Sequence, residues 1–332
     1  MTKVVRFFEF GGPDVLKIVD EEIDPPGPGE VCVRVEAIGL NRSEAGFRSG
    51  RYIEKATLPS RLGYEASGQI SAVGSEVNRL AVGDSVCVIP AFSMNEYGVY
   101  AENAIVPASA VFKRPEGLGH LQSAALWMPY LTAYGALVDV VGLSKGEAVL
   151  ITAASSSVGL AAIDIANRIG AVPVAVTRTE AKRAGLLEAG AAHVIVSESQ
   201  NVSEEVMRFT DELGVRMVFD PVSGQAATQL LDAMATGGVM ILYGNLSGEA
   251  YTPFPTLGPS IEKNLSVRGY LVFEIVFDPR RLARATEFIL SGYKDGDFNP
   301  QISKVFPFDQ IVEAHEYLES NQQLGKVVVE VT

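Results

Sequence analysis

Apolar and polar residues follow one pattern in the first third of the chain and a different pattern afterwards. Residues 30–37 alternate between apolar and polar positions, 68–74 and 84–89 look like further strands, and Gly and Pro punctuate the chain around them. Alternation with a period of two is typical of strands that bury one face. Short strands with turn residues between them predict a β-rich, barrel-like domain here.

After residue 121, short apolar segments alternate with segments of helical periodicity. Predicted strands lie at 147–152, 172–176, 193–196, 215–219 and 239–243, with a further strand near 265–271. Predicted helices lie at 158–169, 180–189, 203–213 with Ser203 as N-cap, and 226–235, which Gly237 and Gly238 end. This alternation predicts an α/β fold, in which a Rossmann doubly wound parallel sheet accompanies the β-rich domain.

The last part of the chain does not continue this alternation. We expect a helix at 280–290, a second helix at 310–320 with Asp309 as N-cap, and a final strand at 326–331. These elements are expected to return to the first domain. The predicted division is therefore 1–122 and 266–332 for one domain and 123–265 for the other.

Composition and charge narrow the classes of function. The 332 residues include 27 Lys and Arg against 40 Asp and Glu, a formal net charge of −13. An acidic chain disfavours nucleic acid as a partner, because phosphate binding depends on Lys and Arg. The longest uncharged stretch near the middle, 148–163, is shorter than the ~20 residues of a membrane helix, so no membrane partner is expected. The first residues lack the pattern of a signal peptide, and we expect a cytoplasmic protein.

A turn of small residues follows the first predicted strand of the second domain. Ser155, Ser156, Ser157 and Val158 connect that strand to the next predicted helix. Small side chains let a pyrophosphate approach the backbone, and the helix N-terminus offers free N–H groups. The strict glycine fingerprint is absent, although serine hydroxyls can donate to phosphate. By itself, the turn is equally consistent with close packing of strand against helix.

The end of the second strand bears on the choice of cofactor. An acidic residue there would accept hydrogen bonds from the free 2′-hydroxyl of NAD. This chain has Thr177 instead, followed by Arg178 and Lys182. Hydroxyl donors and cations suit a 2′-phosphate, so these residues favour NADPH. The alternative is that both cations are ordinary solvated residues at a helix start.

Motifs along nearly the whole chain resemble those of one enzyme superfamily. They lie at residues 11–16, 39–43, 48–52, 62–68, 82–86, 131–134, 190–195 and 325–329. Together they resemble the medium-chain dehydrogenase/reductase superfamily, and more closely its zinc-free quinone oxidoreductase branch. The resemblance implies a GroES-like catalytic domain made of two chain segments, an NADPH-binding domain between them, and a homodimer.

The resemblance also bears on whether the chain holds a catalytic zinc ion. Alcohol dehydrogenases of this superfamily have a cysteine where this chain has Asn41 and a histidine where it has Tyr64. Neither residue is a usual zinc ligand, so we expect no metal, and we expect Glu65 to be a buried, hydrogen-bonded group. Without a Lewis acid, the favoured small-molecule substrates are quinones and α,β-unsaturated carbonyl compounds, whose conjugate position accepts hydride directly.

Roles for individual residues follow from the resemblance and from the expected sheet edge. Tyr52 is the expected catalytic hydrogen-bond donor or acid and Tyr64 a second donor, although either phenol could simply pack. The expected contacts to the cofactor, besides those of the turn and of the second strand, come from Asn41, Thr132, Tyr243, Asn245, Tyr270, Val272 and Lys326. Lys326 is equally consistent with a solvated charge at a strand start.

Three functions remain open at this point. The leading hypothesis is an NADPH-dependent oxidoreductase that transfers hydride to quinones or enones without zinc. The second is a 2-enoyl thioester reductase acting on acyl-CoA. The third belongs to another class, a non-catalytic NADPH- or RNA-binding protein similar to the lens crystallins of this branch.

Overall fold

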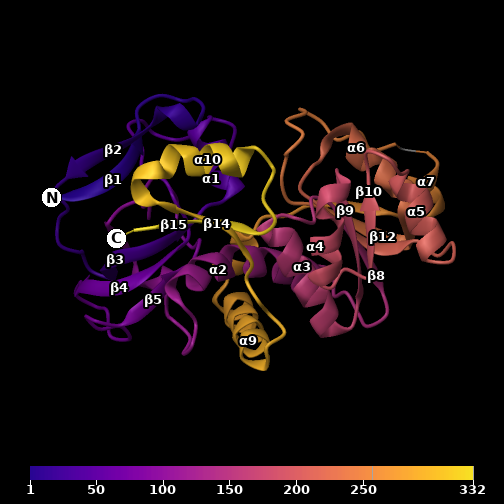
Figure 1. Cartoon of the computed structure of the whole chain (residues 1–332). Helices are drawn as coiled ribbons and strands as arrows, with labels where there is room; N and C mark the ends of the chain where they lie inside the picture. The colour runs from indigo at the N-terminus through magenta and orange to yellow at the C-terminus, as the bar shows by residue number, and fades with distance from the viewer. Residues whose placement is uncertain (256, 332) are drawn as a thin grey trace. The chain divides into compact units, whose positions relative to one another are not determined.

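The computed structural model describes residues 1–255 and 257–331, which form two compact units. Unit 1 consists of Met1–Met128 and Pro300–Thr332, and unit 2 consists of Pro129–Asn299 (Figure 1). The first domain is therefore split between the two ends of the chain. The divisions lie at 128/129 and 299/300 instead of 122/123 and 265/266, because residues 266–299 belong to unit 2.

Unit 2 contains a parallel sheet of six strands in the order β10-β9-β8-β11-β12-β13. The strands are β8 Ala148–Ile151, β9 Val172–Thr177, β10 His193–Val196, β11 Val215–Asp220, β12 Met234–Leu242 and β13 Ser266–Gly269. Counted along the chain, this order is that of the Rossmann fold, which confirms the predicted α/β class. Its ligands are expected outside the carboxyl ends of the strands, where the order reverses between β8 and β11.

The helices of unit 2 differ from prediction mainly at their ends. They are α3 Ser157–Ile169, α4 Arg183–Glu188, α5 Val202–Phe209, α6 Gly224–Gln229, α7 Pro259–Glu262, α8 Phe273–Val276 and α9 Pro279–Asp295. The N-cap of α5 is Asn201 and not Ser203, because the Asn201 side chain accepts from the backbone N–H of Ser203. Residues 237 and 238 do not end a helix, since β12 already begins at Met234, which pairs with Val215.

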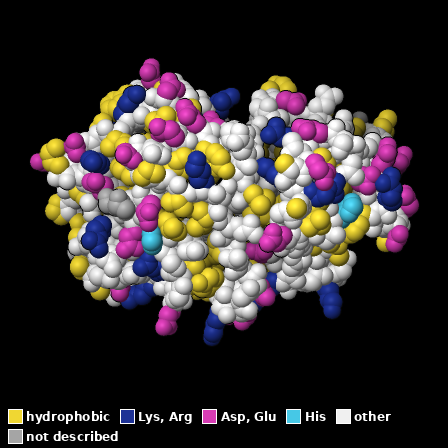
Figure 2. Space-filling view, viewed as in Figure 1, with side chains coloured by type: hydrophobic (Ala, Val, Ile, Leu, Met, Phe, Trp, Pro, Cys, Tyr) yellow, Lys and Arg dark blue, Asp and Glu magenta, His cyan; other side chains and the backbone are white. Residues whose placement is uncertain are grey.

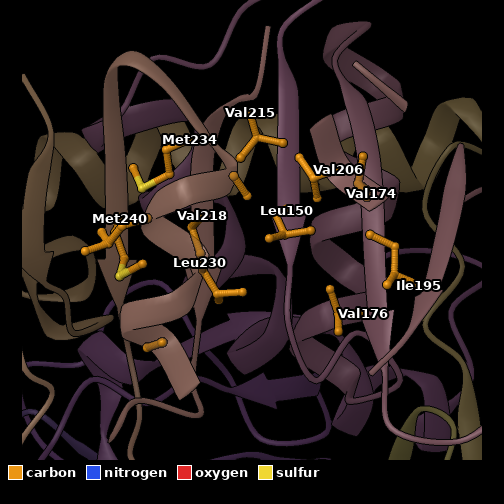
Figure 3. Close-up of a cluster of buried hydrophobic side chains, with 13 residues drawn as sticks. Leu150, Val174, Val176, Ile195, Val206, Val215, Val218, Leu230, Met234 and Met240 are labelled. Carbon is orange, nitrogen blue, oxygen red and sulfur yellow. The ribbon is translucent and has the colours of Figure 1, made fainter. Parts of the chain in front are cut away.

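One hydrophobic cluster joins the strands of this sheet to the helices on one face (Figure 3). Leu150 of β8 and Val218 of β11 lie in the cluster with Val206 of α5 and Leu230. Leu150, Val206 and Val218 are fully buried, and burial of a side chain of this size stabilises a fold by roughly 1.5–3 kcal/mol. This core holds the strands that lead to the turn after β8.

Helix α9 packs on unit 2 and does not return to the first domain as expected. Arg168 of α3 forms ion pairs with Asp295 and Asp297 at the end of α9. The same guanidinium lies 5.5 Å from the ring centre of Phe288 and 5.7 Å from that of Phe298. The two ion pairs and the two cation–π contacts hold the end of α9 against α3.

Unit 1 is β-rich, as predicted. Its sheet has the order β14-β15-β3-β4-β5-β7, with β6 on β3, while β1 Thr2–Phe7 and β2 Leu16–Glu21 form a separate antiparallel pair. The other strands are β3 Glu30–Gly39, β4 Ala66–Val73, β5 Ser85–Val88, β6 Asn103–Pro107, β7 Val111–Lys113, β14 Ile302–Pro307 and β15 Lys326–Glu330. Antiparallel pairing of β15 with β3 joins the C-terminal segment to the first segment.

The helices are α1 Arg42–Arg48, α10 Ile311–Glu319 and α2 His120–Tyr134, the last of which crosses the division at 128/129. Asp309 is not the N-cap of α10. It lies in the 3-10 turn Phe308–Gln310, and Gln310 occupies the cap position.

A buried carboxyl of α3 predicts a measurable pH dependence of stability. The Asp164 side chain accepts a hydrogen bond from the Tyr130 hydroxyl. Burial raises the pKa of Asp164 to about 6, and the hydrogen bond from Tyr130 opposes the rise. Between about pH 4 and pH 6 the folded chain holds a proton that the unfolded chain releases. The free energy of unfolding therefore falls as the pH rises through this window.

We expect Asp164→Asn to remove this dependence, which amounts to about 2 kcal/mol across the window. Urea unfolding at a series of pH values measures it. Glu188→Gln, on an exposed position of α4, is the control and should follow the wild type. An unchanged slope in Asp164→Asn would contradict the assignment.

Candidate cofactor-binding and active site

The turn after β8 is tight. Ala153 has a φ of +45°, an uncommon conformation for a residue with a Cβ atom. A Cβ atom on Gly159 would lie 2.5 Å from the Ala154 carbonyl oxygen, so only glycine lets α3 pack this closely on the turn. The Ser156 side chain is the N-cap of α3 and accepts from the Gly159 N–H at 3.1 Å. The turn thus shows close packing while presenting the N-terminus of a helix of 13 residues.

Cations from the second turn lie next to this one. The Lys182 ammonium donates to the Ser155 hydroxyl at 3.0 Å, which joins two of the predicted cofactor contacts. Burial lowers the pKa of Lys182, and the nearby Arg178 charge lowers it further. Thr177 is buried at the end of β9, while Arg178 is exposed. Two like charges this close favour an anion between or beside them.

Tyr243 follows β12 and brings a hydroxyl to the same turn. Its ring stacks on Phe219, with ring centres 4.0 Å apart. Among the described residues, its hydroxyl is buried without a well-formed hydrogen bond. Burial raises the pKa of this phenol, and the Ser156 hydroxyl beside it opposes the rise. A buried donor without a partner at the helix N-terminus fits a phosphate oxygen.

Other predicted contacts of unit 2 are less direct. The Asn245 amide is exposed and donates to the Glu249 carbonyl of its own loop at 3.0 Å. The Tyr270 N–H donates to the Leu242 carbonyl at 2.9 Å, so this N–H is already engaged, and the contact of Tyr270 with the cofactor stays a prediction. The Val272 carbonyl accepts from the Ile275 N–H at 2.9 Å. Thr132 is 7 % exposed on α2.

The position of the Tyr270 side chain restricts which residue can stand at position 135. Its hydroxyl would lie 2.0 Å from a Cβ atom on Gly135, which begins a π-helical turn. Among the described residues this hydroxyl is also buried without a hydrogen bond. Glycine is therefore required at position 135 as long as the tyrosine ring keeps this place.

Asn41 stands at the start of α1 in unit 1, where its side chain contacts several polar groups. Its backbone N–H donates to Glu44 Oε2 at 2.6 Å, and its Nδ2 donates to Gly39 O at 2.9 Å and to Glu44 Oε1 at 3.1 Å. Asn41 and Glu44 form a capping box on α1. Both amide hydrogens are thereby engaged, and Oδ1 is the only acceptor of this side chain.

Lys326 is neither a solvated charge nor directly exposed to a ligand. Its ammonium is 1 % exposed and donates to Asn41 Oδ1 at 2.7 Å and to Glu65 Oε2 at 2.6 Å. Glu65 Oε1 accepts in addition from the backbone N–H groups of Trp127 at 2.7 Å and Met128 at 3.0 Å. Glu65 is thus the buried, hydrogen-bonded group that was predicted. Lys326 orients Asn41, and its contact with the cofactor stays a prediction.

Tyr52 and Tyr64 are brought together by the loops around α1 and β4. Burial raises the pKa of Tyr52 to about 12, and a hydrogen bond from Tyr64 opposes this rise. Burial also raises the pKa of Tyr64. Tyr64 is fully buried and packs on Phe92, whereas Tyr52 is partly exposed and packs edge-on against Phe47. Both phenols are therefore protonated donors at neutral pH.

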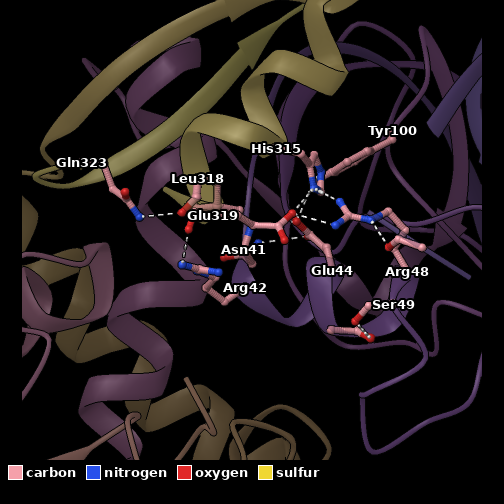
Figure 4. A network of polar contacts seen from close by, with 12 residues as sticks. Asn41, Arg42, Glu44, Arg48, Ser49, Tyr100, His315, Leu318, Glu319 and Gln323 are labelled. Atoms are coloured by element: carbon pink, nitrogen blue, oxygen red, sulfur yellow. Dashed lines mark hydrogen bonds and ion pairs between the residues drawn. The ribbon is translucent and has the colours of Figure 1, made fainter. Parts of the chain in front are cut away.

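A chain of buried polar groups leads from α10 to this cluster (Figure 4). It contains Arg48, His315, Tyr100 and Glu44, none of which was predicted as a functional residue. One signal was present in the sequence: an Asn followed three positions later by a Glu is close to a capping-box pattern. The link to His315 had none, because 267 residues separate it from Arg48.

Two further searches concern metals and membranes. Within residues 1–255 and 257–331, no three His, Cys, Asp or Glu side chains converge in a way that could hold a metal ion. No helix in that described part of the chain combines the length and apolar character needed to cross a bilayer.

Comparison with known proteins gives consistent matches along the chain. Residues 27–116 match the model of the alcohol dehydrogenase GroES-like domain, and residues 157–291 match that of the zinc-binding dehydrogenases. Human quinone oxidoreductase is 31% identical over 331 residues, which cover 99% of this chain and 98% of the relative.

Solved structures agree with these matches. The Escherichia coli quinone oxidoreductase complexed with NADPH has a TM-score of 0.91 at 29% identity, covering 99% of both chains. CurK enoyl reductase has a TM-score of 0.88 at 25% identity, covering 100% of this chain and 99% of the other. The chain belongs to the quinone oxidoreductase branch of the medium-chain dehydrogenase/reductase superfamily.

Proposed function

We propose that the protein is an NADPH-dependent oxidoreductase that transfers hydride to quinones or α,β-unsaturated carbonyl compounds without zinc. The observation that carries the proposal is the pair of protonated phenols, Tyr52 and Tyr64, the second of which shares the hydrogen-bond acceptor Glu44 with Asn41 through its backbone N–H. In the superfamily's alcohol dehydrogenases, zinc ligands stand at positions 41 and 64. Here Asn41 Oδ1 accepts from an ammonium, and neither Asn nor Tyr is a usual zinc ligand.

The residues around the turn after β8 fit the phosphates of NADPH. The buried Tyr243 hydroxyl and the N-terminus of α3 offer donors for the pyrophosphate. Arg178, Lys182 and Ser155 form the group that we assign to the 2′-phosphate. When bound, NADPH supplies the hydride.

Tyr52 is the group that we assign to the reacting oxygen. Reduction of a quinone or an enone places negative charge on the carbonyl oxygen, which a protonated phenol can stabilise or protonate. The Tyr64 side chain opposes the rise in the pKa of Tyr52, which makes that phenol a better donor. Tyr52 is partly exposed and Tyr64 is buried, which suits a substrate contact for the first and a supporting contact for the second.

Two other functions compete with this proposal. Reduction of a 2-enoyl thioester uses the same hydride transfer, and CurK enoyl reductase shares the fold at a TM-score of 0.88. RNA binding has less support. On the face shown in Figure 2, Lys and Arg side chains lie singly among Asp and Glu and form no continuous basic stripe.

We also propose that the protein is a homodimer joined at β13. All four residues of this strand are exposed, and among the described strands it pairs with β12 alone, at the edge of the sheet. Edge strands present unpaired N–H and C=O groups that a second strand can satisfy. Val267, 36 % exposed, would be covered by such pairing.

A substrate panel with Tyr52→Phe tests the activity. NADPH oxidation is measured with simple quinones, enones and a short enoyl-CoA. Reduction of NADP⁺ is measured with primary alcohols. We expect turnover of quinones or enones, and a fall in kcat of about 100-fold in Tyr52→Phe with an unchanged KM for NADPH. Tyr251→Phe, at an 82 % exposed phenol, is the matched control. Turnover of alcohols alone, or of nothing in the panel, would refute the proposal.

Arg178→Ala tests the choice of cofactor. Loss of a charge-assisted contact to the 2′-phosphate should raise the KM for NADPH by about tenfold to a hundredfold. The KM for NADH should not change, because NADH lacks that phosphate. Arg208→Ala, on an exposed arginine of α5, controls for loss of charge. Equal effects on both cofactors would contradict the assignment.

Val267→Lys tests the dimer. A lysine on the edge strand opposes pairing with a second copy, so sedimentation should show more monomer than in the wild type. Val305→Lys is the matched control, since Val305 is 38 % exposed on β14, the edge strand of the other sheet. A monomeric wild type, or dissociation only in the control, would disprove this interface.

A further inference from the structure

Glu44 is a fully buried carboxylate that accepts from four donors. Oε2 accepts from the Asn41 N–H at 2.6 Å and from the Tyr100 hydroxyl at 2.6 Å. Oε1 accepts from the Tyr64 N–H at 3.0 Å and from Asn41 Nδ2 at 3.1 Å. Three of the four donors belong to the two residues that stand at the former zinc-ligand positions. One carboxylate therefore fixes both Asn41 and the backbone that carries the Tyr64 phenol.

The direction of the hydrogen bonds along the chain behind Glu44 follows from its first member (Figure 4). Arg48 Nη1 lies 2.8 Å from His315 Nδ1, and a guanidinium can only donate. Nδ1 must therefore accept, which puts the imidazole hydrogen on Nε2. Nε2 lies 3.2 Å from the Tyr100 hydroxyl oxygen and donates to it. The Tyr100 hydrogen is then directed to Glu44.

His315 is held in this neutral form. It is fully buried, and burial lowers its pKa to about 3, with the charges of Arg48 and Arg42 adding to the effect. Arg48 is itself 1 % exposed and is held by the Gly11 carbonyl at 3.2 Å and by Glu319 at 2.7 Å. The donor at the start of the chain is thus a fixed, permanent cation.

We propose that Glu44 is a positioning residue of the site that contains Asn41, Tyr52 and Tyr64, and that the Arg48–His315–Tyr100 chain keeps it ionised. The proposal rests on the proposed function for what the positioned groups do. It adds a purpose for the buried residues of α10, which contact neither Tyr52 nor Asn41 in any hydrogen bond described above.

Burial and the groups that face Glu44 shift its pKa in opposite directions. Burial raises the pKa of Glu44, while the hydrogen bonds from Tyr100 and Asn41 and the Lys326 charge lower it. All four groups that face its oxygens are donors, so a proton on Glu44 would have to displace one of them. We therefore place the carboxylate form at neutral pH.

The phenols respond to that negative charge. The Glu44 charge raises the pKa of Tyr52 and of Tyr64, and Glu54 acts on both in the same direction. It also raises the pKa of Tyr100, which Arg48 opposes. An ionised Glu44 consequently keeps the two site phenols protonated, which is the form that can donate to a substrate oxygen.

Infrared difference spectroscopy on the whole chain measures the protonation state of Glu44 and needs no turnover. The carbonyl band of a protonated carboxylic acid is compared between wild type, Glu44→Gln and Tyr100→Phe over a range of pH. We expect no Glu44 band in the wild type at neutral pH. In Tyr100→Phe the band should persist to a pH about one unit higher than in the wild type, a tenfold change in proton affinity.

Tyr97→Phe is the matched control. The Tyr97 hydroxyl donates to Glu30 Oε1 at 2.7 Å, the same chemistry as the Tyr100–Glu44 pair, but Glu30 makes no contact with Asn41. The spectrum of Tyr97→Phe in the region of the Glu44 band should match that of the wild type. The comparison of Tyr100→Phe with the wild type stands on its own should Glu44→Gln fail to fold.

Kinetics and cofactor binding test the positioning. The acid limb of kcat/KM should move up by about one pH unit in Tyr100→Phe and stay in place in Tyr97→Phe. NADPH binding, followed by its fluorescence, should weaken in Tyr100→Phe below that limb and recover above it. A uniform loss at all pH values would indicate a merely structural role and overturn the positioning role.

A Glu44 acid band in the wild type at neutral pH would overturn the claim of ionisation, whatever the activity. A wild type with the expected spectrum and pH-dependent NADPH binding but no turnover in the substrate panel would instead refute the proposed reaction. The two failures are therefore distinguishable.

Discussion

The buried ion pair between Lys326 and Glu65 is the interaction on which unit 1 depends. The two side chains are 1 % and 0 % exposed, and their atoms lie 2.6 Å apart. Burying two charges is costly unless every remaining donor and acceptor finds a partner. Here Asn41 and the backbone N–H groups of Trp127 and Met128 supply those partners. The pair thus ties the C-terminal strand, the start of α1 and helix α2 to one point.

This constraint explains why residues far apart in the chain must come together. Lys326 lies on β15, which pairs with β3, and the loop after β3 contains Asn41. Glu44 on α1 then connects Asn41 to Tyr64 and, through Tyr100, to His315 of α10. Removing one partner from such a network leaves a buried charge without compensation, so its members depend on one another more than surface contacts do.

The sequence predicted the strands of unit 2 well because a buried parallel strand must be an apolar run, as in β8 and β10. Helix ends were missed where a neighbouring residue capped the helix, as at Asn201 and Gln310. The start of β12 at Met234 depends on pairing with Val215 and is not a local property. Tyr52 and Tyr64 were predicted from the family resemblance, whereas Arg48 and His315 meet only after the two ends of the chain pack together.

The Lys326 ammonium, which donates to Asn41, differs in kind from a metal ion. Its charge is covalently attached, its ammonium donates hydrogen bonds, and it offers no open coordination position to a substrate oxygen. Two of its donors already serve Asn41 and Glu65. The ammonium is also 1 % exposed, so in the proposed reaction a developing oxyanion is assigned to another donor, Tyr52, the phenol that is both partly exposed and held protonated. The donor set around Lys326 thus supports the proposed quinone and enone substrates, whose own conjugation accepts hydride.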